Sequence, residues 1–161
     1  MYSGSQGYRC FDQSLIHGNS IVAIGSASHG AYVGGNSSLR SIGTAGLIDG
    51  SSGYGIYAIE GSQVRFTGTI SNSASTAIRA LGAQVKINAP QTLLSNSGSA
   101  YCLYADSHGF IDARNITVDA TGGQQIYAER FSSIDVGGIV GTPTYNPPLN
   151  TAANRNSYIA T

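Results

Sequence analysis

Residues 55–68 read Gly-Ile-Tyr-Ala-Ile-Glu-Gly-Ser-Gln-Val-Arg-Phe-Thr-Gly, and the segment Ile56-Tyr57-Ala58 within them recurs along the chain in related forms. The recurrences are Ile78-Arg79-Ala80, Leu103-Tyr104-Ala105 and Ile126-Tyr127-Ala128, with weaker copies at Tyr8-Arg9-Cys10 and Tyr32-Val33-Gly34. The last residues of successive copies are 24, 24, 22, 25 and 23 positions apart. A repeat of this length indicates a solenoid, in which each unit is one turn that buries its apolar side chains against its neighbours.

Two further apolar columns keep the same spacing. One consists of Ile24, Ile48, Ile70, Leu94, Val118 and Val140, and the other of the pairs Val64/Phe66, Val85/Ile87, Ile111/Ala113 and Ile134/Val136. Serine, asparagine and glycine separate these segments, and such residues favour tight turns. Each unit therefore contains three short segments of alternating polarity, which is the pattern of β-strands.

This pattern predicts an all-β fold, a right-handed single-stranded parallel β-helix of about six coils with three short strands per coil. Because side chains alternate along a strand, we expect Ile56 and Ala58 to point inward and Tyr57 to point outward. Helical repeats are excluded, since no 3.6-residue periodicity is present. The predicted parts are a lead-in over residues 1–7, the β-helix over 8–141 and an irregular C-terminal extension over 142–161.

The composition fits this fold and excludes several functions. The chain has 161 residues, 22 glycines, no tryptophan and only 10% charged residues. Eight Lys and Arg balance eight Asp and Glu, so no overall positive charge attracts nucleic acid or an anionic membrane. No apolar run approaches the roughly 20 residues that span a bilayer. Residues 1–7 lack the basic and apolar parts of a signal peptide, and their abrupt start leads us to expect a piece of a longer protein.

The sequence points to no metal site and no cofactor. The register places Cys10 and Cys102 several coils apart, so we expect two free thiols. His17, His29 and His108 fall in no common column, and closely spaced cysteine pairs, phosphate loops and His-Glu-x-x-His motifs are absent from the sequence. Any chemistry must therefore come from side chains on the outside of the coils.

One outward column carries aromatic and basic residues at one position per coil. The register predicts its members as Arg9, Val33, Tyr57, Arg79, Tyr104 and Tyr127. A row of tyrosine and arginine faces can stack on sugar rings, and it can equally pack against another subunit. The candidate glycan-binding or subunit-contact residues are Tyr57, Arg79, Tyr104 and Tyr127. Both interpretations remain open, as does simple coverage of the core by the tyrosines.

A second outward column carries charges that pass from basic to acidic. Its predicted members are Arg40, Arg65, Lys86, Asp112 and Asp135. Asp112 and Asp135 would lie about one strand spacing apart, close to the roughly 5 Å between the carboxyls of a retaining glycosidase. Asp106 and Glu129 form an alternative pair, and two like charges this close should raise one carboxyl pKa. The other interpretation is a solvated ladder of charges, which stacked repeats produce by geometry alone.

The segments 55–68 and Tyr-Cys-Leu-Tyr-Ala-Asp-Ser-His-Gly-Phe-Ile-Asp-Ala at 101–113 resemble the β-helix coils of bacteriophage tailspike and tail-fibre proteins. The ending Asn-Thr-Ala-Ala-Asn-Arg-Asn-Ser-Tyr-Ile-Ala-Thr at 150–161 is similar to the exit from such a stem. The resemblance implies a homotrimer at the virion tail, folded in the host cytoplasm before assembly, that binds host surface polysaccharide and in many cases cleaves it. The coils are also similar to the passenger domains of bacterial autotransporter adhesins.

We expect a structural or receptor-binding segment rather than an enzyme. Depolymerase tailspikes usually carry long loops that form a substrate groove, whereas the turns of this chain are short and leave little to enclose a transition state. Two free thiols and a neutral charge balance fit assembly in a reducing cytoplasm better than export. A fragment of a glycan-depolymerising tailspike, acting as a glycoside hydrolase, is the alternative, and an adhesin passenger domain is the second alternative.

Overall fold

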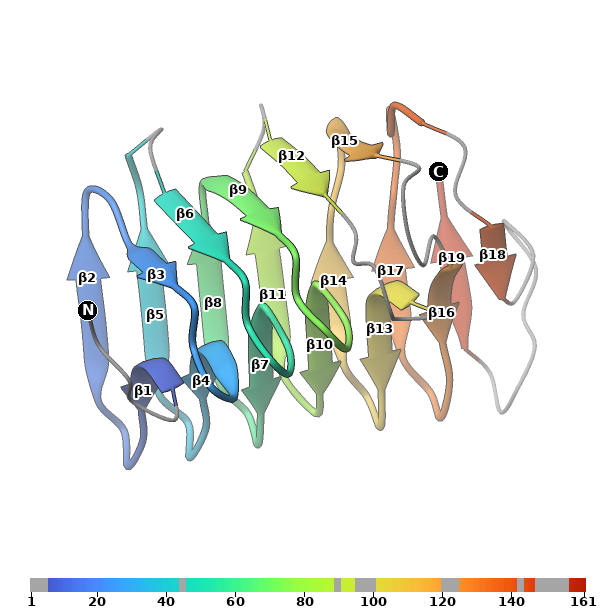
Figure 1. The fold of residues 1–161 in the computed structure, drawn as a ribbon. Coiled ribbons are helices and arrows are strands. Elements are labelled where there is room, and N and C mark those ends of the chain that lie inside the picture. Colours follow the sequence, from blue (N-terminus) through green and yellow to red (C-terminus); the bar gives the residue numbers. More distant parts are fainter. Residues whose placement is uncertain are drawn as a thin grey trace.

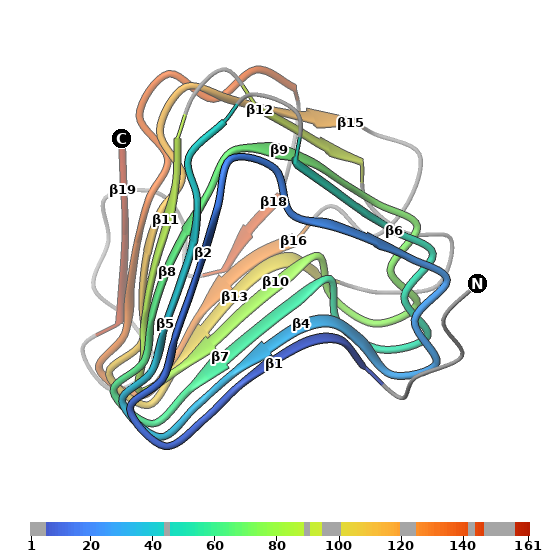
Figure 2. The same ribbon diagram turned by 90° about the vertical axis from the view of Figure 1, so that its left-hand side faces the viewer.

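The structure is a computed structural model, and it confirms an all-β solenoid with parallel strands (Figure 1). It describes residues 6–43, 46–88, 91–94, 101–119, 125–141, 144–146 and 157–161. Seen from the N-terminal end, the chain turns clockwise as it recedes, so the predicted right-handed coil is confirmed (Figure 2). None of the described residues forms a helix long and apolar enough to cross a membrane.

Three parallel sheets form the sides of the solenoid, and each is named here by its strands. Sheet A contains β1 (Gln6–Cys10), β4 (His29–Val33), β7 (Ile56–Ile59), β10 (Ile78–Leu81), β13 (Tyr101–Asp106), β16 (Gln125–Ala128) and β18 (Thr144–Asn146). Sheet B contains β2 (Leu15–Gly18), β5 (Ser38–Ser41), β8 (Gln63–Phe66), β11 (Gln84–Ile87), β14 (Phe110–Asp112), β17 (Ser133–Asp135) and β19 (Tyr158–Ala160). Sheet C contains β3 (Val22–Ile24), β6 (Gly46–Asp49), β9 (Gly68–Ser71), β12 (Gln91–Leu94) and β15 (Ile116–Asp119).

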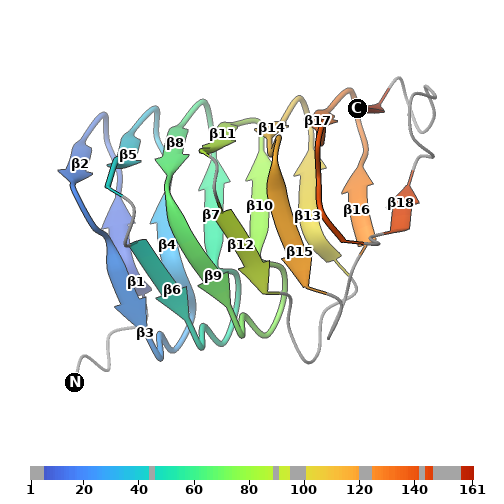
Figure 3. The same cartoon turned by 90° about the horizontal axis from the view of Figure 1, so that it is seen from above.

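The strands follow one another around the three sheets in chain order, so each turn uses one strand from each sheet. The described residues form five complete turns, from β1–β3 to β13–β15, and the strands β16 to β19 continue sheets A and B. Figure 3 shows the strands of sheet C side by side, in front of the strands of sheet A. Each strand pairs with the strand one turn away, as the repeat predicts.

The predicted alanine column lies inside the stack. Ala80 pairs with Ala58 on one side and with Ala105 on the other, and Ala128 follows Ala105. All four are fully buried, as are the aliphatic residues two positions earlier, Ile56, Ile78, Leu103 and Ile126. Burying one such large aliphatic side chain stabilises the fold by roughly 1.5–3 kcal/mol. Stacking the turns is therefore what creates the core.

The weak copy near residue 33 was predicted one residue too late. Val33, not Gly34, pairs with Ala58, and Tyr32 pairs with Tyr57. Val33 is fully buried, whereas Gly34 opens the turn after β4. Because a slip of one residue sends every side chain to the other face, Val33 leaves the predicted outward column and Tyr32 takes its place.

The sheet C column needs the same correction at three positions, Ile24, Leu94 and Val140. Ile24 is 61% exposed and lies outside the core, and Val140, also 61% exposed, bridges to Thr117 rather than to Val118. The residues paired in register along this column are Ala23, Ile48, Ile70, Leu93 and Val118. The third predicted column, from Val64 to Ile134 in sheet B, is confirmed.

Short turns at the corners are held by backbone conformation and buried serines. Asn36 and Gly61 have φ angles of 57° and 71° at the corner between sheets A and B. A Cβ atom at Gly61 would lie 2.2 Å from Asn36 Oδ1, and the positive φ angle would strain any other residue, so glycine is favoured there. Beneath the same corner, Ser62 Oγ donates to Val33 O at 3.0 Å and Ser132 Oγ donates to Ala105 O at 2.8 Å.

The limits of the solenoid differ in detail from the predicted ranges. β1 begins at Gln6, inside the expected lead-in over 1–7. Within 142–161, β18 pairs with β16 and β19 pairs with β17, so two short strands prolong sheets A and B. Residues 147–156 lie outside the described residues, and the irregular extension as a whole stays a prediction.

Candidate functional site

The outer face of sheet A carries one aromatic or basic side chain per turn, in register. Strand pairing places Arg9, Tyr32, Tyr57, Arg79, Tyr104, Tyr127 and Asn146 in one column. We call the half-buried central members, Tyr32, Tyr57, Arg79, Tyr104 and Tyr127, the tyrosine ladder. The four predicted residues of this face are therefore brought together, and Tyr32 extends the row by one turn.

The rings of the tyrosine ladder are in mutual contact. Tyr32 and Tyr57 stack with centroids 5.4 Å apart, and Tyr104 and Tyr127 meet edge to face at 5.2 Å. The guanidinium of Arg79 lies between the two pairs, 5.5 Å from the centroid of Tyr57 and 4.8 Å from that of Tyr104. Each such cation–π contact contributes roughly 0.5–1 kcal/mol at an exposed site. The ladder is thus a preformed, continuous surface.

A second rank of rings, which was not predicted from the sequence, flanks the ladder. His29 stacks on Tyr54 at 5.1 Å, and Tyr54 contacts Tyr57 at 4.8 Å. Tyr101 contacts Tyr104 at 5.3 Å. Each of these rings lies three residues before a ladder tyrosine, and this spacing was the available signal. Burial lowers the pKa of His29, so the neutral imidazole is favoured within this cluster.

A buried carboxylate fixes the basic member of the ladder. The side chain of Asp106 is 2% exposed, and its Oδ2 lies 3.6 Å from Arg79 Nη2. Its Oδ1 lies 3.5 Å from Arg130 Nε and accepts a hydrogen bond from Ser107 Oγ at 2.9 Å. Arg79 Nη1 also donates to the Tyr54 hydroxyl at 2.7 Å. Arg79 is therefore held in place without a ligand.

Glu129 holds the other end of the ladder. It accepts hydrogen bonds from the hydroxyls of Tyr104 and Tyr127, and it forms an ion pair with Arg130 at 3.5 Å. Burial, followed by the hydrogen bond to Glu129, raises the pKa of Tyr104, and burial raises that of Tyr127 as well. Both hydroxyls thus stay protonated as donors. The alternative carboxylate pair, Asp106 and Glu129, is engaged in positioning the ladder, and a catalytic role for it stays a prediction.

The charged column of sheet B has the predicted members in the predicted order. Strand pairing links His17, Arg40, Arg65, Lys86, Asp112 and Asp135 along its outer face. The attraction expected between Lys86 and Asp112 is present, with Nζ and Oδ2 3.4 Å apart. Asp112 and Asp135 lie side by side on neighbouring strands.

Arg114, a residue outside the predicted column, changes the chemistry of this carboxylate pair. Its Nε and Nη2 donate to the two Asp112 carboxylate oxygens at 2.8 Å each, and its Nε lies 3.4 Å from Asp135 Oδ2. These hydrogen bonds lower the pKa of Asp112, although burial opposes them. Of this pair, Asp112 is therefore not the carboxyl whose pKa is raised. A catalytic role for Asp112 and Asp135 stays a prediction. The lowered pKa favours the carboxylate form of Asp112, so this residue is poorly suited to donate a proton as a general acid.

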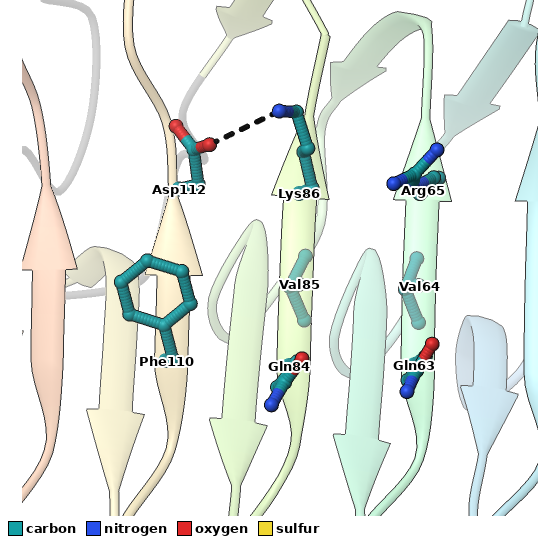
Figure 4. A pocket seen from close by; sticks show the side chains of 8 residues that line it. All are labelled: Gln63, Val64, Arg65, Gln84, Val85, Lys86, Phe110 and Asp112. Atoms are coloured by element: carbon teal, nitrogen blue, oxygen red, sulfur yellow. Dashed lines mark ion pairs between the residues drawn. The ribbon is translucent and has the colours of Figure 1, made fainter.

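Beside these charges, the face of sheet B has two open depressions that meet at Lys86 and Asp112. The first, of about 270 Å³, is lined by Gln63, Val64, Arg65, Gln84, Val85, Lys86, Phe110 and Asp112 (Figure 4). The second, of about 290 Å³, is lined by Lys86, Ile87, Asn88, Asp112, Arg114 and Asn115. Cations, amides and one aromatic ring therefore surround a common area.

The two cysteines and His108 lie outside the tyrosine ladder and the charged column. Cys10 and Cys102 are buried free thiols, and burial raises the pKa of Cys102 to about 12. Within the described ranges, no group of three His, Cys, Asp or Glu side chains is arranged to hold a metal ion. His108 stacks on Phe131 at a turn, with centroids 5.5 Å apart.

Fold and surface together define a right-handed parallel β-solenoid with an aromatic ladder on one sheet and a charged column on another. Comparison of the chain with protein-family models, curated proteins and solved structures finds no match.

Proposed function

We propose that this chain is a structural, receptor-binding segment of a phage tail fibre or tailspike, and that it engages host surface polysaccharide through the tyrosine ladder. In this proposal three copies assemble into a homotrimer at the virion tail, after folding in the host cytoplasm. The observation that supports it best is the row of half-buried rings, in contact within each pair of tyrosines, with Arg79 between the two pairs. The resemblance of the coils to tailspike coils supplies the biological setting.

The ladder suits a polymer of sugars for physical reasons. Tyrosine offers an apolar ring face for the C–H side of a sugar and a hydroxyl for its polar edge. The rungs repeat at the strand spacing of about 4.8 Å, so an extended chain along the solenoid axis could contact several in succession. Stacking, together with Asp106 and Glu129, already orders these side chains, and little conformational entropy remains to be lost on binding.

Substitution of single rungs tests the ladder. We expect Tyr57→Ala, Tyr104→Ala and Tyr127→Ala each to weaken binding to a panel of immobilised capsule and lipopolysaccharide glycans by about tenfold, as for a central aromatic contact. Phe131→Ala is the matched control, because this ring is 52% exposed but lies at a turn outside the ladder. Unchanged glycan binding together with loss of the trimer would instead make the ladder a subunit contact.

A glycan-cleaving function is the alternative, and the position of Asp112 beside both depressions favours it. An assay for new reducing ends on the same glycans tests this alternative. Cleavage that disappears in Asp112→Asn and Asp135→Asn would establish it, while cleavage that survives both substitutions would exclude this pair.

The second alternative, an autotransporter passenger domain, differs in assembly. Sedimentation velocity separates the two, because a passenger is expected at the chain mass of 16.6 kDa and a fibre segment at three times that mass. A monomer at micromolar concentration would contradict the trimer.

A further inference from the structure

Like charges lie on top of one another along the N-terminal half of the sheet B face. Arg40 pairs in register with Arg65, and Arg65 with Lys86. Side chains directly opposite on neighbouring strands are about 5 Å apart at their Cβ atoms, and like charges in such positions destabilise a sheet. The sequence thus maintains an electrostatic repulsion that a neutral side chain would relieve.

The negative charges on this face do not neutralise the row. Asp112 accepts two hydrogen bonds from Arg114 and forms an ion pair with Lys86 at 3.4 Å, so its single charge is shared between two cations. Arg40 and Arg65 form no ion pair with any residue that the structure describes. Counting Arg40, Arg65, Lys86 and Arg114 against Asp112 and Asp135 leaves an excess of two positive charges. This local excess stands out in a chain whose net charge is zero.

The depression beside these positive charges also has uncharged side chains that can bind a sugar. Its floor is formed by the strands at Val64 and Val85, and the exposed amides of Gln63 and Gln84 line one side (Figure 4). The ring of Phe110, which is 39% exposed, follows Gln84 in the same row. Amides can exchange hydrogen bonds with hydroxyls, and the ring can cover an apolar C–H face.

We propose that the outer face of sheet B is a second binding site, for an acidic polysaccharide, with Arg65 and Lys86 contacting its anionic groups and Phe110 and the two glutamines contacting the sugar. This inference rests on the proposed function, since it assumes that the chain binds glycans. The anionic group can be a carboxylate or a sulfate, because guanidinium and ammonium groups bind either. A nucleic acid is disfavoured, since the protein as a whole carries no net positive charge.

Binding of three polymers tests the proposal. We expect sodium oligogalacturonate or dextran sulfate to bind in low-salt buffer and neutral dextran not to bind this face; comparing the first two identifies the anionic group. Arg65→Gln should weaken binding of the acidic polymer by roughly tenfold, the size of one charge-assisted contact. Arg65→Lys, which keeps the positive charge, should retain most of the affinity for the acidic polymer. Without ligand, Arg65→Gln should be at least as thermally stable as the unsubstituted chain, so lost binding cannot be ascribed to unfolding.

Arg9→Gln is the control for net charge, because Arg9 is exposed on sheet A outside the tyrosine ladder. Equal weakening by Arg9→Gln and Arg65→Gln would overturn the site, and so would equal affinity for neutral dextran or for an oligothymidylate. If the acidic polymer binds but only the ladder substitutions weaken it, the sheet B site is wrong and the proposed function survives. If no glycan binds either face, both are wrong.

Discussion

The guanidinium carbon of Arg79 lies 4.8 Å from the ring centroid of Tyr104, and together with its contact to Tyr57 it joins two pairs of tyrosines into one surface. Tyr32 and Tyr57 lie on one side of it, and Tyr104 and Tyr127 on the other. The same arginine is ion-paired with the buried Asp106, so the middle of the tyrosine ladder is tied to the interior at one point.

Removing this tie should destabilise the fold. We expect Arg79→Met to lower the free energy of unfolding by about 2 kcal/mol, because Asp106 loses one of its two cationic partners while its side chain stays buried. Urea unfolding measures the effect. Combining Arg79→Met with Asp106→Asn should restore part of the loss. Arg9→Met is the control, and a cost for Arg79→Met no larger than for Arg9→Met would contradict the proposed role.

The fold should become less stable in alkali because of Tyr104. Its pKa is raised above the ordinary 10.0 in the folded protein, so the folded state keeps a proton that the unfolded chain releases. The stability contributed by this tyrosine is therefore complete below about pH 10 and is lost as the pH rises through the folded-state pKa. Urea unfolding between about pH 8 and pH 11 tests this, with tyrosinate absorbance as a second readout. Tyr104→Phe should make the alkaline decline shallower and leave the parts due to Tyr127 and Cys102, and an unchanged decline would assign it to other groups.

The fold should also lose stability in acid through Asp112. Arg114 holds the pKa of this carboxyl below its ordinary 3.8, so the contribution is present above that pH and is lost as the pH falls through the folded-state pKa. Asp112→Asn should be less stable than the unsubstituted chain at neutral pH and should approach it below about pH 4. Thermal unfolding across this range checks the prediction. Parallel pH profiles for the two proteins would be the contrary result.

The alanine column should tolerate little added volume. Ala80 is fully buried between Ala58 and Ala105, so Ala80→Leu should cost about 1–3 kcal/mol through overpacking. Gln84→Leu introduces the same side chain at an exposed position one strand later in the same turn and should change stability by less than about 0.5 kcal/mol. Chemical denaturation compares the two, and equal costs would argue against the vertical alignment of the alanines.

The sequence predicted the parts of the fold that repeat strictly. Ala58, Ala80, Ala105 and Ala128 are preceded two positions earlier by a buried aliphatic residue, and that pattern predicts the register of sheet A; the column from Val64 to Ile134 does the same for sheet B. The predicted register was wrong at Val33, because this turn buries a valine where the later turns bury an alanine. The small Gly34 was therefore aligned with the alanines in place of Val33. The register was also wrong at Ile24 and Leu94 because each neighbours a second apolar residue, and alternation alone cannot choose between the two.

The site was predicted less completely than the fold, since a column assigns one outward residue to each strand. Tyr54 and Tyr101 contact the tyrosine ladder from three residues upstream, and Arg114 binds Asp112 from two residues downstream. Such contacts depend on how side chains turn at the ends of strands. The repeat positions the strands but does not determine those directions, so the hydrogen bonds from Arg114 that lower the pKa of Asp112 were not predicted.

The pairing of every strand with its counterpart one turn away has a mechanical consequence. Hydrogen bonds in a sheet run across the strands, so here they point along the solenoid axis. Tension applied along that axis would break the hydrogen bonds between neighbouring turns one turn at a time. A sideways force on one turn would instead be resisted by the hydrogen bonds of three sheets at once. The molecule should therefore be stiff against bending and shear, and weakest when pulled from its two ends.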